Sequence, residues 1–411
     1  MDICDRFIKY VKVDTTSNPM CTESPSFEGE WNLANMLADD LREIGLENVH
    51  VSEHCYVTAS LPATDGFENC PKLGFIAHMD TVDAAPGKNV NPIIWHCYDG
   101  GDLKLSDEIV LSDRQFPFLK SLVGQTLITS DGTTLLGADD KAGIAEIFSM
   151  LEELNALNIP HGPIKIGFTP DEEIGSGTDY FELDRFDADF AYTVDGGDAG
   201  ELEYQNFNAA QAELEFHGLS VHPGSAKNIM VNAQNIAIEF HALLPESERP
   251  EHTEGEEGFF HLCNMVGDVT KAELTYIIRD HSREKFEIRK DEMKRAAEFI
   301  ESKHGAGTVK LTLKDSYYNM EEKILPHMHL IDNAKAAIEE AGATPIIFPV
   351  RGGTDGALLS YKGLPCPNLG TGGFNAHGVY ELASLEKMKI CRDILINIVR
   401  IYSQQRNTGK A

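Results

Sequence analysis

Residues 164–177 read Ile-Lys-Ile-Gly-Phe-Thr-Pro-Asp-Glu-Glu-Ile-Gly-Ser-Gly, so an apolar run ends abruptly in three adjacent acids. The run at 164–168 predicts a buried strand, and the proline and glycines around the acids predict a sharp turn. If the acids continue in an extended conformation, Glu172 and Glu173 point to opposite faces, so one can bind a cation while its neighbour faces the cation's water. An isolated acidic turn is usually only solvated, so the rest of the chain must decide between these interpretations.

The composition narrows the class of protein. A chain of 411 residues favours two domains, and 35 basic against 66 acidic residues give a net charge of -31, which repels nucleic acid and anionic membrane surfaces. We therefore expect no nucleic-acid or membrane partner. Early acids and the lack of a long apolar run near the N-terminus lead us to expect no signal peptide. The eight cysteines contain no Cys-x-x-Cys, which favours reduced thiols in a cytoplasmic protein.

Other apolar runs end as the first one does. The run that starts at residue 73 closes in His78 and Asp80, the run at 190–194 closes in Asp195, and Asp139 precedes a helix predicted over 144–157. Strands that alternate with helices predict an α/β fold, in which ligands collect at the carboxyl ends of the strands. Further expected elements are helices at 28–44, 326–341 and 385–404, a strand at 344–350, and a long loop excursion with small strands at 85–130.

Residues 208–315 follow a different order. Strands are predicted at 209–216, 259–265, 273–279 and 309–314, and helices at 226–244 and 283–303. The order β-α-β-β-α-β is typical of a ferredoxin-like domain. Its insertion predicts a discontinuous α/β domain made of residues 1–207 and 316–411.

Six residues at strand ends or glycine turns form a candidate metal site: His78, Asp80, Asp139, Glu173, Asp195 and His377. Imidazole and carboxylate ligands suit zinc, with cobalt or manganese as substitutes, and the absence of nearby thiolates argues against a structural zinc. Two ions need about five protein ligands if one carboxylate bridges them. We expect Asp139 to bridge, with His78 and Glu173 on one ion and Asp195 and His377 on the other. No nucleophile elbow, Walker P-loop or His-Glu-x-x-His supports a competing chemistry.

Eight motifs carry a family resemblance: HMDT (78–81), LGADDKAG (136–143), TPDEEIG (169–175), YTVDGG (192–197), VHPG (221–224), IIRD (277–280), RGGTDGA (351–357) and NAHG (375–378). Through them nearly the whole chain resembles the M20 family of dinuclear zinc peptidases, in its aminotripeptidase branch. The resemblance implies a mixed-sheet catalytic domain with an inserted lid used for dimerisation, so a homodimer is expected. It implies five metal ligands, His78, Asp139, Glu173, Asp195 and His377, with Asp139 as the bridge and Asp140 as second choice. It also implies that Glu172 is the general base and that Asp80 orients His78.

Three further residues are substrate-binding candidates. On its own, His222 reads as a surface or capping histidine, but the resemblance implies that it reaches across the dimer to the substrate's carbonyl oxygen. Arg279 and Arg351 would otherwise be ordinary surface charges, yet an arginine in the site can clamp a carboxylate with two hydrogen bonds. The acid that holds the substrate's ammonium is open between Asp171 and Asp355.

The expected activity is zinc-dependent release of the N-terminal residue from tripeptides. The first alternative is another M20-type amidohydrolase that acts on dipeptides or N-acyl amino acids. The second is a metal-binding or scaffold protein without catalysis. Glu172 disfavours the last alternative, because a binding protein has no use for a base beside its metal.

Overall fold

The computed structural model describes residues 1–405. The last six residues of the predicted segment 316–411 therefore lie outside the described residues. The chain divides into two compact units. The first contains Met1–Tyr204, Glu322–Phe348 and the described residues from Thr354 to 405, and the second contains Gln205–Glu321 and Pro349–Gly353. The segment 208–315, expected to be ferredoxin-like, lies inside the second unit.

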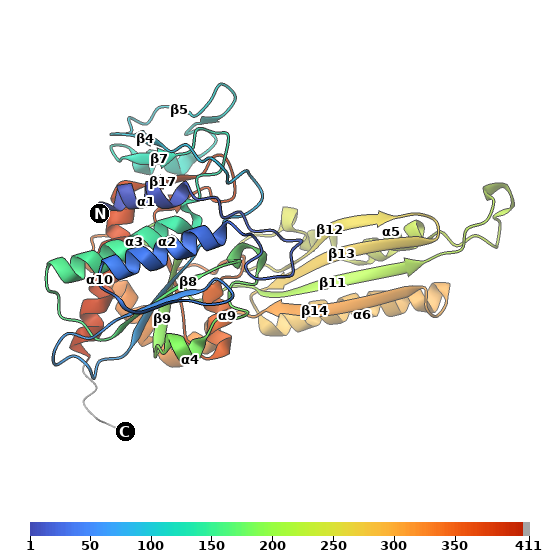
Figure 1. Cartoon of the computed structure of the whole chain (residues 1–411). Coiled ribbons are helices and arrows are strands. Elements are labelled where there is room, and N and C mark those ends of the chain that lie inside the picture. The colour runs from blue at the N-terminus through green and yellow to red at the C-terminus, as the bar shows by residue number, and fades with distance from the viewer. Residues whose placement is uncertain (406–411) are drawn as a thin grey trace. The chain divides into compact units, whose positions relative to one another are not determined.

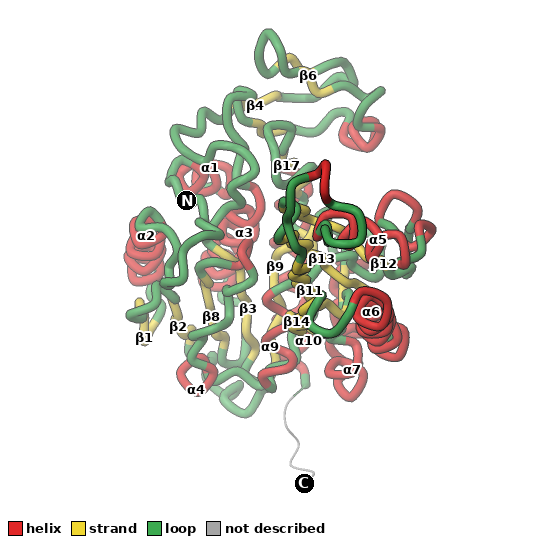
Figure 2. The backbone as a smooth tube through the Cα atoms, turned by 90° about the vertical axis from the view of Figure 1, so that its right-hand side faces the viewer, coloured by secondary structure: helices red, strands yellow, loops and turns green. Residues whose placement is uncertain are grey.

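The first unit is built on a mixed seven-stranded sheet of order β1-β2-β8-β3-β9-β15-β10. Its centre is parallel, because β3 pairs in parallel with both β8 and β9, and β9 pairs in parallel with β15, while the remaining neighbours are antiparallel. Figure 2 shows β1, β2, β8, β3 and β9 side by side. The predicted α/β class with a mixed sheet is confirmed. The strands are β1 Glu47–Val51, β2 Val57–Leu61, β3 Leu73–His78, β8 Ile164–Thr169, β9 Phe190–Gly196, β10 Leu202–Glu203 and β15 Asn368–Gly370.

The long helix α3 (Ala138–Ala156) packs against β3 and β9 on one side and against α1 and α10 on the other. A side chain at Gly143 would place its Cβ only 1.9 Å from the Val194 carbonyl oxygen, so glycine permits this close approach of helix and sheet. None of the helices in residues 1–405 combines the length and apolar composition needed to cross a bilayer. Other helices of this unit that Figure 1 labels are α1 Ile3–Val11, α2 Glu30–Glu43, α4 Leu183–Phe186, α9 Asp355–Lys362 and α10 Leu385–Gln404. The unit also contains α8 His329–Glu340.

Two small sheets occupy the region predicted as a loop excursion and its surroundings. One has the order β16-β17-β7-β4, and the other pairs β5 with β6. Within the first, β17 pairs with both β16 and β7, so the loops next to these strands are brought together. The strands are β4 Ile93–Trp95, β5 Leu103–Lys104, β6 Val110–Leu111, β7 Leu127–Thr129, β16 Gly373–Phe374 and β17 Leu382–Ser384.

The second unit has the predicted β-α-β-β-α-β order, with an antiparallel sheet of order β12-β13-β11-β14. Both helices pack against the sheet and each other over an apolar core that includes Phe216, Phe240 and Tyr276. Helix α6 begins where the Ser282 side chain accepts the Lys285 N–H as an N-cap. The elements are β11 Asn208–His217, α5 Ala233–Leu243, β12 Phe259–Gly267, β13 Lys271–Asp280, α6 Arg283–His304 and β14 Val309–Tyr317.

Three predicted elements were wrong in extent or kind. The helix predicted at 226–244 begins only at Ala233, because Asn232 accepts the Gln234 N–H and caps it there. The strand predicted at 344–350 forms only isolated bridges at Ile346 and Val350, since prolines at 345 and 349 remove the N–H donors that a ladder needs. The helix predicted at 144–157 starts at Ala138, although Asp139 and the residue after it are not helical.

Candidate metal centre

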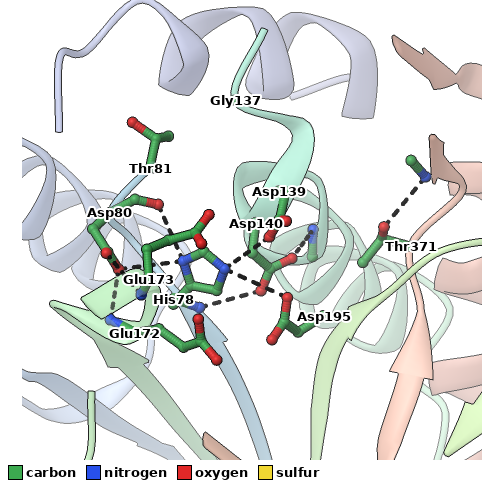
Figure 3. Close-up of polar contacts among 12 residues, drawn as sticks. His78, Asp80, Thr81, Gly137, Asp139, Asp140, Glu172, Glu173, Asp195 and Thr371 are labelled. Atoms are coloured by element: carbon green, nitrogen blue, oxygen red, sulfur yellow. Dashed lines mark hydrogen bonds and ion pairs between the residues drawn. The ribbon is translucent and has the colours of Figure 1, made fainter. Parts of the chain in front are cut away.

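Five predicted ligands come from different elements at one edge of the main sheet. His78 ends β3 and Asp195 lies near the end of β9, which pairs directly with β3. Asp139 lies at the start of α3, Glu173 in a 3₁₀ turn after β8, and His377 in the loop between β16 and β17. Because parallel strands end at the same edge, residues far apart in sequence meet here, as Figure 3 shows for His78, Asp139, Glu173 and Asp195.

The ligand atoms form two groups that share Asp139, each with all its atoms within 4.8 Å of one another. In the strand-held group, His78 Nε2 lies 2.8 Å from Asp139 Oδ1 and 3.4 Å from Asp195 Oδ1. In the loop-held group, His377 Nε2 lies 3.2 Å from Asp139 Oδ2 and 3.0 Å from Glu173 Oε2.

This grouping corrects the predicted pairing of ligands. His78 was expected with Glu173 and Asp195 with His377, but the structure groups His78 with Asp195 and Glu173 with His377. The cause is topological: β3 and β9 are adjacent parallel strands, so the residues at their ends are neighbours.

The donor set fits a pair of cations. Among residues 1–405, the carboxylates of Asp139, Glu173 and Asp195 have ion pairs only with imidazoles. Glu173 Oε1 is buried without a hydrogen-bond partner in this described part of the chain. Hydrogen bonds to Asp139 and Glu173 raise the pKa of His377 to about 11, so an imidazolium balances the acids where a metal would. Two imidazoles and three carboxylates are donors that zinc, cobalt and manganese accept.

Asp80 is fully buried and holds both sides of the centre. Its Oδ1 accepts the Glu172 N–H at 3.0 Å, and its Oδ2 accepts the Glu173 N–H at 3.1 Å. His78 Nδ1 lies 3.3 Å from Asp80 Oδ1 and 3.1 Å from the Asp80 carbonyl oxygen. A proton on Nδ1 satisfies these acceptors, so Nε2, on the side of Asp139 and Asp195, is the nitrogen that can bind a metal once it loses its own proton.

Glu172 lies in a 3₁₀ turn, Glu172–Ile174, so the expectation that Glu172 and Glu173 alternate along an extended segment was wrong. Asp171 has a φ of 57°, which turns the chain before the pair. The Glu172 side chain extends toward the side of His78 on which Asp195 lies (Figure 3). Burial, followed by the negative charge of Asp195, raises the pKa of Glu172 well above its usual value.

The other acids of these motifs have different surroundings. Asp140 belongs to neither group, because its carboxylate accepts the His78 and Gly143 N–H groups. Both oxygens of Asp171 accept the Ser26 N–H, whereas Asp355 is buried with Oδ2 unpartnered among residues 1–405.

Three predicted substrate-binding residues lie in the second unit. His222 is exposed and its Nδ1 accepts the Gly224 N–H, so it does cap a turn. Arg279 donates to the Ile278 carbonyl at 3.0 Å, and Arg351 donates to the Gly255 carbonyl at 2.7 Å. The predicted metal ligands belong to the first unit, and the substrate roles of His222, Arg279 and Arg351 stay predictions.

Sequence reasoning missed Glu381, which is 1% exposed and accepts three backbone N–H groups next to Asp139. These partners lie 242 to 245 residues away along the chain, so no local pattern reveals them. Its place four residues after His377 was the one available signal.

Comparison with known proteins agrees with this geometry. Residues 131–401 match the family described as peptidase family M20/M25/M40. The chain belongs to this peptidase family. A relative in the curated proteins, peptidase T from Alkaliphilus oremlandii, is 51% identical over 407 residues, covering 98% of this chain and 100% of the relative.

Solved structures show the same M20 fold. Aminopeptidase PepT from Bacillus cereus is 25% identical, with a TM-score of 0.77 over 97% of this chain and 98% of that one. A tripeptidase from Staphylococcus aureus is 23% identical, with a TM-score of 0.78 over 98% of each chain. The family and branch predicted from the motifs are confirmed.

Proposed function

We propose that this M20-family chain is a metallo-aminopeptidase that releases the N-terminal residue of tripeptides. The observation that carries the proposal is the pair of ligand groups sharing Asp139, with Glu172 on the same turn as Glu173. Its full-length likeness to peptidase T, and its likeness to solved aminopeptidase and tripeptidase folds, support the same activity. The substrate is a small peptide.

We assign the ligands from the two groups. His78 and Asp195 would hold one ion and Glu173 and His377 the other, and Asp139, which belongs to both groups, would be shared. Zinc is the proposed metal, with cobalt or manganese as substitutes. When bound, the pair of ions polarises the scissile carbonyl and lowers the pKa of water.

Glu172 is the proposed general base. Its carboxylate takes a proton from the attacking water and returns one to the leaving amine, so each turnover leaves Glu172 unchanged. The Asp80 carboxylate fixes the backbone N–H of Glu172, which supports a constant position for the base.

Length selection requires groups that bind both ends of the peptide. Asp355 is the better candidate for the ammonium, because its Oδ2 has no hydrogen-bond partner among residues 1–405, while both oxygens of Asp171 accept the Ser26 N–H. Arg279 and Arg351 remain candidates for the carboxylate. Charge-assisted hydrogen bonds contribute about 1.5 to 3 kcal/mol, so a missing terminus costs on the order of 10- to 100-fold in specificity.

A homodimer made through the second unit is proposed as well. Two features of that unit support it: β12 is an edge strand of the sheet, and exposed apolar side chains gather on and near α5 and β12, namely Leu219, Ile229, Val231, Ile238, Leu243, Met265 and Val266. His222 accepts at Nδ1, which leaves Nε2–H as a donor for a carbonyl oxygen across the dimer.

The dimer role of His222 is testable by mixing subunits. Inactive His222→Ala and Glu172→Gln chains should regain part of the activity in verified heterodimers, since one site then has both groups. Loss of a single oxyanion donor costs roughly 100- to 1,000-fold. No recovery would assign His222 to its own subunit or to no catalytic role.

We place the enzyme in the cytoplasm. All eight cysteines lie within residues 1–405, and each is a free thiol in the structure. Reduced thiols without disulfides are typical of that compartment.

The activity is tested with a peptide panel. We expect a Met-Gly-Gly-type tripeptide to have a higher kcat/KM than the dipeptide, the tetrapeptide, and the N-acetylated or C-amidated tripeptide, and a chelator to abolish all cleavage. Faster cleavage of dipeptides or N-acyl amino acids would move the assignment to the alternative amidohydrolase. Equal rates on the amidated tripeptide would remove the arginine clamp.

A further inference from the structure

The loop-held group has little local support for one of its ligands. The His377 side chain is 51% exposed, against 2% for His78, and His377 adopts a φ of 68°. It lies on the loop that joins β16 to β17, outside any helix or strand. An exposed loop residue has many accessible conformations, so something else must hold it near Asp139.

Glu381 connects two segments: the loop between β16 and β17, which contains His377, and the segment that runs from β7 to Asp139. The Glu381 N–H donates to the Gly378 carbonyl at 3.2 Å, which closes a turn directly after His377. The Glu381 carboxylate crosses to the other loop: Oε2 accepts the Leu136 and Gly137 N–H groups at 2.8 and 2.7 Å, and Oε1 accepts the Asp139 N–H at 3.0 Å.

The sheet explains why these loops are adjacent. The strand β17 begins immediately after Glu381 and pairs with β7, which leads into the segment that ends at Asp139. The strand pairing brings the loops together, and the buried carboxylate fixes their separation through three charge-assisted hydrogen bonds.

We propose that Glu381 is a positioning residue that sets the distance between Asp139 and His377 and thereby the affinity of the loop-held metal site. The proposal rests on the proposed metal centre and concerns ion binding alone. It holds whichever peptide is cleaved.

The test titrates metal-free protein with Co²⁺ and follows both binding steps by calorimetry and visible absorption. In Glu381→Gln, the amide offers one acceptor oxygen and turns an NH2 group toward backbone N–H donors. We expect one Co²⁺ affinity to fall roughly 10- to 100-fold, as for other residues that hold metal ligands, and the other to stay unchanged. Excess Co²⁺ should restore turnover.

A double-mutant cycle with His377→Ala identifies the affected site. His377→Ala removes the loop-held group, so adding Glu381→Gln should leave the affinity of the remaining ion unchanged. A further loss in that background, or equal weakening of both ions in the single variant, would overturn the proposal. So would a lower melting temperature with both affinities intact.

Glu146→Gln is a matched control. Glu146 is also fully buried, and its carboxylate has no hydrogen-bond partner within residues 1–405. We expect this variant to bind both ions as the wild type does. If Glu381→Gln does not fold, Glu381→Asp keeps the charge but is one methylene shorter, and the same selective loss is expected. Wild-type affinities for both ions in folded Glu381→Asp would contradict a dependence on this carboxylate's position.

Discussion

His78 and His377 both place Nε2 beside Asp139, yet a strand holds the first and a loop holds the second. His78 ends a buried strand and its side chain is 2% exposed, whereas His377 lies on a loop and is 51% exposed. Asp195 is also held by a strand, β9, which pairs with β3. Glu173, like His377, lies outside the strands, in a 3₁₀ turn after β8.

The difference indicates two ways to hold a ligand. Pairing of β3 with β9 fixes the strand-held ligands as part of the sheet. The loop-held ligands depend on buried carboxylates that accept backbone N–H groups, Asp80 for the turn and Glu381 for the loop. Substitutions at these carboxylates should therefore affect the strand-held group and the loop-held group differently.

Removal of all metal is the largest expected perturbation. Metal-free protein should have no measurable peptidase activity, because the imidazolium groups that balance the carboxylates cannot act as a Lewis acid on the scissile carbonyl or on water. During titration with Co²⁺, the strand-held group should fill first, since its ligands are already in place. Activity should rise mainly with the second equivalent, measured by tripeptide hydrolysis. Full activity at well under one ion per chain would contradict a paired centre.

Glu172→Gln should have the next largest effect. The amide is nearly isosteric but cannot take a proton, so kcat should fall on the order of 100- to 10,000-fold. Both Co²⁺ affinities should be retained, because Glu172 is in neither ligand group. The comparison is kcat alongside metal content, with Glu146→Gln as the control of equal chemical change. Near-normal turnover would remove Glu172 from the mechanism.

Asp80→Asn and Asp140→Asn should have different effects on the Co²⁺ affinities of the two ligand groups. Asp80 contacts His78 and both glutamate N–H groups of the turn, so its loss should weaken both ions roughly 10- to 100-fold. Asp140 accepts the His78 and Gly143 N–H groups and belongs to neither ligand group, so its loss should weaken the strand-held ion alone. Separate Co²⁺ affinities measure both effects. Identical profiles for the two variants would show that the two ligand groups are not independent.

Much of this arrangement could be predicted from sequence because the signals are local. Apolar runs that end in His78, Glu172 or Asp195 mark strand ends, and parallel strands bring such ends to one edge. The β-α-β-β-α-β order of the second unit followed from the same periodicities. The members of the two candidate ligand groups could thus be named without coordinates.

The errors came from features that sequence does not encode locally. The pairing of ligands depends on which strands are neighbours, and β9 lies beside β3 although it comes much later in the chain. Asp171 turns the chain, so alternation failed at Glu172 and Glu173. Glu381 reaches partners more than 240 residues away, a contact that only the fold creates.

The pH dependence of metal affinity is the smallest expected effect. Burial alone would lower the pKa of His78, but the charge of Asp195 and hydrogen bonds to Asp139 raise it well above its usual value. The pKa of His377 is raised to about 11 by hydrogen bonds to Asp139 and Glu173. Both imidazoles are therefore protonated at neutral pH in the metal-free protein, and each ion must displace one proton.

Because both pKa values lie above neutrality, affinity should rise with pH, by about tenfold per pH unit for each ion between about pH 6 and pH 8. Burial raises the pKa of Asp195 to about 6, so below that pH the strand-held ion must displace a second proton and its slope should steepen. Co²⁺ titrations across this range, in buffers of different ionisation enthalpy, give both the slopes and the number of protons released. In His377→Ala, only the pH dependence of the affinity for the strand-held ion should remain. Affinities that do not change between about pH 6 and pH 8 would mean that the metal-free imidazoles are neutral and that the acids do not hold their protons.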